Sequence, residues 1–141
     1  MELTDSHCHI HFADYELDPE EAIKAAAKHS VNRLICVGCT LADSALAVTF
    51  AASHENAWAS IGLHPHESAV YVNDHTALQQ FHSLAKKPKV VAIGETGLDY
   101  FKNFQPRDLQ QKVFHEQLKI AIEVGLPVII HTRDADDDTI N

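Results

Sequence analysis

No stretch of the sequence says more about the fold than VVAIGETGLDY, residues Val90–Tyr100. The run Val90–Gly94 predicts a buried strand, and Glu95 follows it directly before a long loop. If side chains alternate as in a regular strand, Val91, Ile93 and Glu95 lie on one face. A carboxylate beside such a run needs a cation or hydrogen bonds to offset its desolvation. A solvated glutamate at a strand end is the alternative, and this stretch alone leaves both open.

Four further apolar runs flank this one, separated by stretches with helical patterns. Strands are predicted over Leu3–Ile10, Arg33–Val37, Ala57–Leu63 and Val128–His131. Helices are predicted over Pro19–Lys28, Leu41–Ser53, Thr76–Ala85 and Pro106–Val124, and another begins within Asp134–Asn141. Strands that alternate with helices of this length predict βα units around a parallel sheet.

Residues with capping chemistry mark the helix ends. Asp18 and Thr40 are N-cap candidates, because their side-chain oxygens can accept hydrogen bonds from the first free N–H groups of a helix. Pro19 suits the first helical position. Gly125 suits the left-handed residue that closes a helix after Val124.

The βα pattern fits either a doubly wound sheet or a TIM-like (β/α)8 barrel. Polar residues crowd the carboxyl ends of nearly all the predicted strands, where barrel active sites lie, and this favours the barrel. A complete barrel takes about 250 residues, whereas this chain has 141. We therefore expect residues 1–141 to form a single α/β domain, the N-terminal portion of a barrel with about five βα units.

The composition excludes some classes of function. Eleven Lys and Arg against twenty Asp and Glu give a net charge of −9, which argues against a broad basic surface for nucleic acid. A cation-centred site could still bind a phosphodiester, because bound metal ions supply local positive charge. The amino terminus shows no signal peptide, no apolar run is long enough for a membrane span, and three cysteines do not make a disulfide framework. These features predict a cytoplasmic protein.

Histidines gather at the predicted strand ends. His7 and His9 share one face of the first strand, so their imidazoles can bind one cation, and Asp5 on that face could orient one of them. His131 follows the last apolar run directly, and His64 follows the third strand within GLHPH. Each pattern alone has an ordinary structural explanation. Their concentration at one rim, together with the acid of VVAIGETGLDY, favours two cations bridged by a carboxylate.

A C-x-x-C spacing, Cys36 to Cys39, lies between the second strand and the following helix, as in thioredoxin-like redox sites. Cys36 belongs to the apolar run and is expected to be buried. The spacing therefore carries less weight than the histidine pattern.

Four segments resemble, in order and spacing, the TatD-type metal-dependent deoxyribonucleases of the amidohydrolase superfamily: DSHCHI (5–10), GLHPH (62–66), GETGLDY (94–100) and LPVIIHTRDA (126–135). The resemblance spans essentially the whole chain. It implies a TIM-like barrel, two divalent metal ions (Zn, Mn or Mg) and hydrolysis of phosphodiester bonds in DNA. By motif, the metal ligands would be His7, His9, Glu95 and His131, and the substrate-binding residues would be His64, Asp99 and Arg133.

The sequence departs from the family pattern in two ways. His11 stands where the family commonly has Asp. A further His ligand and the Asp expected as general acid/base would lie beyond Asn141, so no catalytic residue is identified, and the chain alone is expected to bind metal weakly and hydrolyse little. Open edges at the first and fifth strands would favour self-association. Two alternatives stay open: an amidohydrolase-type enzyme acting on a small amide or ester, and a noncatalytic metal-binding fragment.

Overall fold

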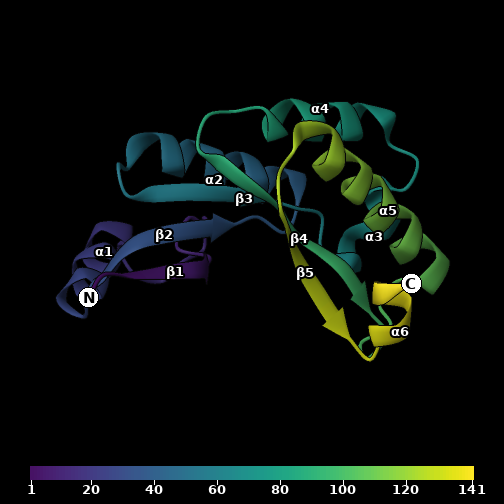
Figure 1. Ribbon diagram of the computed structural model, residues 1–141, viewed down its shortest axis with the longest axis horizontal. Helices are drawn as coiled ribbons and strands as arrows, with labels where there is room; N and C mark the ends of the chain where they lie inside the picture. Colours follow the sequence, from purple (N-terminus) through teal and green to yellow (C-terminus); the bar gives the residue numbers. More distant parts are fainter.

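The computed structural model describes residues 1–141 and shows five strands that curl into part of a barrel (Figure 1). The strands are β1 (Leu3–Cys8), β2 (Val31–Val37), β3 (Ala57–Ile61), β4 (Val90–Asp99) and β5 (Val128–Arg133). They pair in chain order, and every pairing is parallel. A doubly wound sheet would reverse its strand order at a switch point, so the sequential order confirms the prediction of a barrel portion.

Helices fill the connections between the strands (Figure 1). They are α1 (Pro19–Lys28), α2 (Leu41–Ser53), α3 (Ser68–Tyr71), α4 (His75–Ala85), α5 (Arg107–Val124) and α6 (Asp136–Ile140), with a short 3-10 helix, η1 (Pro65–Glu67). The predicted ranges of the four long helices are confirmed to within a residue or two. None of these helices is both long and apolar enough to cross a bilayer.

The predicted capping residues end the helices as their chemistry suggests. Asp18 accepts a hydrogen bond from the N–H of Glu21, and Thr40 accepts one from the N–H of Asp43, both at 3.1 Å. Gly125 closes α5 with a φ of +70°, the left-handed conformation that favours glycine. Local sequence rules therefore fix where α1 and α2 begin and where α5 ends.

All five strands differ from the prediction at one end, and β2 begins at Val31 and β5 ends at Arg133, each two residues outside its predicted range. β4 does not stop at Gly94 but continues to Asp99, because residues 96–99 pair with residues 130–133 of β5 after a register shift. β1 ends at Cys8, since the chain turns at His9, whose carbonyl accepts from the N–H of Phe12. β3 is also shorter than predicted, and the residues after it turn into η1 and α3, which the sequence did not predict.

The side-chain alternation predicted across Val91, Ile93 and Glu95 is wrong. Ile93 is fully buried in the main core, whereas Val91 lines the concave side of the sheet. The pairings of β4 with both neighbours contain register shifts. A shift of one residue moves a side chain to the opposite face of a strand, which accounts for the difference.

The main core lies between the sheet and the helices α2, α4 and α5. Ala47 and Ala51 bring α2 close to β3, whose Ala59 and Ile61 are fully buried, and Phe81 of α4 packs against the same cluster. Burial of this apolar surface is the main favourable term in folding. It fixes β3 and β4 as a rigid base for the residues at their carboxyl ends.

The opposite, concave side of the sheet is an open groove of about 370 Å³. Ser6 of β1, Ile35 of β2, Val91 of β4 and Ile129 of β5 contribute to its lining. β1 and β5 are the edge strands of the sheet, as predicted.

Candidate metal centre

Glu95, on β4, points its two carboxylate oxygens toward histidines on the two edge strands. Oε2 lies 3.6 Å from Nε2 of His7 on β1, and Oε1 lies 3.0 Å from Nδ1 of His131 on β5. The Glu95 side chain is only 16% exposed, so its charge is partly desolvated and depends on these neighbours. A single carboxylate therefore lies between two groups of imidazoles.

The first group of candidate ligands contains His7, His9 and Glu95. Their ligand atoms lie within 4.8 Å of one another. Nδ1 of His9 lies 2.8 Å from the carbonyl oxygen of Val37, a contact that fixes the ring and leaves Nε2 for a cation. The orienting role predicted for Asp5 is wrong, because its carboxylate accepts from the backbone N–H of His7 and the orienting contact comes from β2.

The second group contains His64, Glu95 and His131, whose ligand atoms also lie within 4.8 Å of one another. The rings of His64 and His131 are 4.6 Å apart. Nδ1 of His64 accepts from the backbone N–H of His66, so Nε2 is the nitrogen left for a ligand. The sequence suggested a substrate contact for His64, whereas the structure places it among groups that could hold a metal.

Burial, reinforced by the neighbouring His131, lowers the pKa of His64 to about 4. The His64 ring is therefore neutral at pH 7. Neutral imidazole is the form that binds metal ions, so no proton has to be removed from His64 at that pH.

Asp99 lies directly behind the second group and is 1% exposed. Its Oδ2 lies 2.9 Å from Nε2 of His66 and 3.2 Å from Nε2 of His131. Burial opposes the charged form, but hydrogen bonds from the backbone N–H of Lys102 and from the two imidazoles outweigh it and lower the pKa of Asp99. This placement suits a carboxylate that orients His131, and differs from the substrate contact that the sequence suggested.

Two buried glutamines of α5 hold the strand ends that carry this site. Gln110 accepts from the N–H of Asp99 at 2.8 Å and donates to the carbonyl of the same residue at 3.1 Å. Gln117 clamps Leu63 in the same way, at 2.8 and 3.0 Å, just before His64. Sequence reasoning missed both. The available signal was their spacing of two helical turns within a helix that otherwise buries apolar residues.

Cys39 is another neighbour of Glu95 that the sequence did not reveal, with its Sγ 4.0 Å from Oε2. Burial, together with the charge of Glu95, raises the pKa of Cys39 to about 12. Cys36 is fully buried, and its hydrogen bond with Cys8 and its burial raise its pKa as well. Protonated, buried thiols are poor nucleophiles, which argues against a redox role for this pair.

A family model described as TatD related DNase matches residues 4–141. The chain belongs to the TatD related DNase family. This confirms the resemblance found in the sequence motifs.

The relatives of this TatD-family chain carry both general and specific names. It is 37% identical over 138 residues, 98% of the chain and 53% of the relative, to "Uncharacterized metal-dependent hydrolase YabD" of Bacillus subtilis. It is 38% identical over 123 residues, 87% of the chain and 46% of the relative, to "3'-5' ssDNA/RNA exonuclease TatD" of Cronobacter sakazakii. The chain thus spans about half the length of the curated relatives it matches.

Solved structures show the same architecture. The TatD homologue YjjV of Escherichia coli superposes with a TM-score of 0.84 at 32% identity, over 96% of this chain and 52% of YjjV. A TatD family hydrolase of Entamoeba histolytica superposes with a TM-score of 0.85 at 22% identity, over 99% of this chain and 52% of that structure. The second likeness concerns the fold alone.

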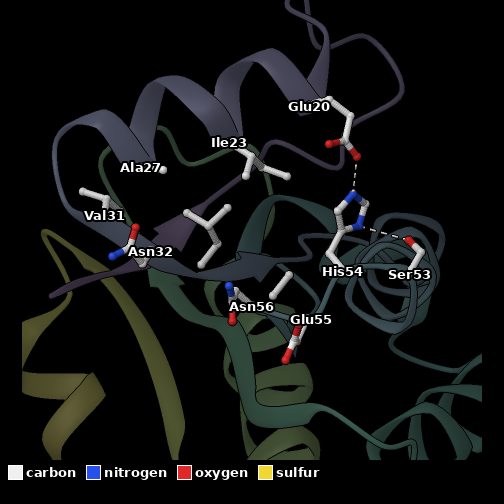
Figure 2. Close-up of a pocket in the computed structure, with 11 residues that line it drawn as sticks. Glu20, Ile23, Ala27, Val31, Asn32, Ser53, His54, Glu55 and Asn56 are labelled. Atoms are coloured by element: carbon white, nitrogen blue, oxygen red, sulfur yellow. Dashed lines mark hydrogen bonds and ion pairs between the residues drawn. The ribbon is translucent and has the colours of Figure 1, made fainter.

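A pocket of about 290 Å³ lies away from this site, at the amino ends of β2 and β3 (Figure 2). An ion pair between Glu20 of α1 and His54, which follows α2, closes one side at 3.0 Å, and Ile23 and Val31 supply apolar lining. None of the candidate ligands lines this pocket. The candidate ligands of this TatD-family chain lie instead at the carboxyl ends of the strands, where barrel active sites lie.

Acid should destabilise the metal-free protein. Burial, followed by the neighbouring His9, lowers the pKa of His11 to about 4, while Asp43 acts in the opposite direction. Between about pH 6.5 and 4, His11 and His64 bind protons in the unfolded chain but stay unprotonated in the folded chain. The free energy of unfolding should therefore fall as the pH drops through this window, by up to about 1.4 kcal/mol per pH unit for each histidine.

Urea denaturation in the presence of a chelator, at several pH values across this window, measures the effect. His11→Phe keeps an aromatic ring at the buried position and removes the titrating group, so its stability should depend less steeply on pH. A wild-type stability that is flat or rises toward pH 4 would contradict the expectation.

Proposed function

We propose that this chain supplies the N-terminal part of a metal-dependent hydrolase that cleaves phosphodiester bonds in single-stranded DNA. The observation that carries the proposal is the position of Glu95 between two histidines. One carboxylate oxygen faces His7 on β1, and the other faces His131 on β5. The relatives named as exonucleases acting on single-stranded DNA and RNA support the choice of substrate. The relatives named only as hydrolases support the reaction type.

His7, His9 and Glu95 would hold one divalent cation, and His64, Glu95 and His131 would hold a second. The residues fit such a pair, because each group brings three ligand atoms within 4.8 Å and Glu95 belongs to both. Mixed imidazole and carboxylate ligands suit Zn²⁺ or Mn²⁺ better than Mg²⁺. When bound, such ions would polarise the phosphoryl oxygen and lower the pKa of an attacking water.

The other residues of the site would position these ligands and the substrate. Asp99 holds the far nitrogen of His131 and so sets the orientation of that ring. Arg133 lies two residues after His131, on the same face of β5. It is exposed at the rim and can donate a hydrogen bond to a phosphate oxygen. The general acid/base stays unassigned within residues 1–141.

Hydrolysis of a labelled single-stranded oligonucleotide, with chelator-treated protein before and after Mn²⁺ is restored, tests this proposal. We expect cleavage only with the metal. We also expect a version extended by three further βα units to turn over faster than the 141-residue chain, since the extension would supply the remaining ligands. Equal activity with and without metal, or no cleavage by the extended version, would overturn the proposal.

Two further expectations accompany this function. The three free cysteines are compatible with a reducing, cytoplasmic location.

The open edges of β1 and β5 offer unpaired backbone groups to another chain, so we expect residues 1–141 alone to self-associate. Multi-angle light scattering checks this, and a monodisperse monomer would contradict it.

A further inference from the structure

The loop that follows β4 exposes two phenylalanines beside the candidate metal centre. Phe101 is 55% exposed and Phe104 is 63% exposed. Large aromatic side chains usually bury most of their surface. Two exposed within four residues, next to a polar site, call for a partner that covers them.

A positively charged side chain lies near each of these two rings. The guanidinium carbon of Arg133 lies 4.0 Å from the ring centroid of Phe101, and Nζ of Lys102 lies 6.0 Å from that of Phe104. The Phe101 contact is close enough to hold Arg133 in place at the end of β5. The loop therefore combines apolar faces with positive charge.

A short chain of contacts connects Phe104 to the candidate ligands. Its ring lies 4.8 Å from the ring of His66, inclined by 65°. His66 bonds to Asp99 at 2.9 Å, and Asp99 reaches His131 at 3.2 Å. A molecule resting on Phe104 is thus adjacent to the second group of ligands.

Exposed aromatic rings beside cationic side chains are notable in a chain whose net charge is −9. Most of the molecule offers no electrostatic attraction to nucleic acid, so binding energy has to come from local contacts at the rim. Exposed aromatic rings with neighbouring cations bind single strands by stacking on bases and pairing with phosphates. Bases within a duplex already stack on each other and cannot use such a ring.

We propose that Phe104 is a base-stacking residue for the nucleotide next to the scissile phosphate, and that Arg133, held by Phe101, contacts a phosphate of the same strand. This inference rests on the proposed function and adds the residues that bind the nucleotide. Stacking tolerates any base, because every base has a π face. Recognition at Phe104 is therefore independent of sequence.

Fluorescence anisotropy of a labelled single-stranded DNA, with the metal chelated, tests the inference without relying on hydrolysis. Phe104→Ala should weaken binding about tenfold, whereas Phe104→Trp should retain it. An oligonucleotide with abasic positions should lose affinity for the wild type and show little further loss with Phe104→Ala. Arg133→Ala should weaken both oligonucleotides alike and reduce the salt dependence of binding.

Ile122→Ala is the matched surface control, since Ile122 is 82% exposed on α5 and lies away from the rim. Unchanged affinity in Phe104→Ala, or an equal loss for intact and abasic strands, would overturn the stacking role. Metal-dependent cleavage by the extended version would still support the proposed function in that case. Absence of strand binding by the wild type, together with no cleavage by the extended version, would overturn the two together.

Discussion

Replacing Glu95 by glutamine should strongly weaken metal binding at both cation sites together. The amide keeps the size of the side chain but removes the negative charge that lies between the two imidazole groups. Loss of a partner that only orients a metal ligand costs about 10–100-fold in affinity. The loss of a shared ligand should be larger, so we expect at least about a hundredfold weaker binding of Mn²⁺ or Zn²⁺ by calorimetry.

The matched control is Glu123→Gln, which makes the same chemical change at an exposed glutamate of α5 that pairs with His82. Glu123→Gln should leave the metal isotherm unchanged. If Glu95→Gln bound two ions with wild-type affinity, or lost only one of them, Glu95 would not be the shared ligand.

Replacing Gly97 by alanine should cost about 3 kcal/mol or more of stability. Gly97 has a φ of +142°, a region that side chains rarely adopt, and an added Cβ would lie 2.0 Å from the carbonyl oxygen of His131. The new methyl group can fit only if β4 and β5 separate, because the atom it meets belongs to the backbone. Separation would also pull Glu95 away from His131, so metal affinity should fall together with stability.

Gly125→Ala is the comparison for this substitution. Gly125 has a φ of +70°, but nothing lies within 4 Å of a Cβ added there. Gly125→Ala should therefore lower the free energy of unfolding only by the cost of holding alanine in the left-handed conformation, about 1–2 kcal/mol. It should leave metal binding intact. Urea unfolding of both variants measures the difference, and equal losses at the two glycines would refute the proposed clash.

Short-range sequence rules were enough to predict much of the fold. Asp18, Thr40 and Gly125 act through hydrogen bonds or backbone angles within a few residues, so their roles can be inferred from local sequence. The apolar runs likewise predicted the five strands, because burial favours such runs wherever they pair. The convergence of the edge strands on Glu95 followed from the rule that parallel strands share a carboxyl end.

Other features depend on contacts between distant segments and could not be inferred in this way. The sequence predicted a loop after Glu95, but pairing with β5 keeps the chain extended through Asp99. Gln110 and Gln117 clamp strand ends that lie 11 and 54 residues away in sequence. The sequence motif suggested that Asp99 contacts the substrate. Its position behind His131 is instead set by tertiary packing.

Electron paramagnetic resonance of the Mn²⁺-loaded protein tests most directly whether Glu95 is shared by two cations. Ions in a two-metal site lie about 3.5–4 Å apart and couple magnetically. We predict a multiline signal from coupled Mn²⁺ pairs in the wild type and its disappearance in Glu95→Gln. A wild-type spectrum of isolated Mn²⁺ ions at every loading would contradict the account.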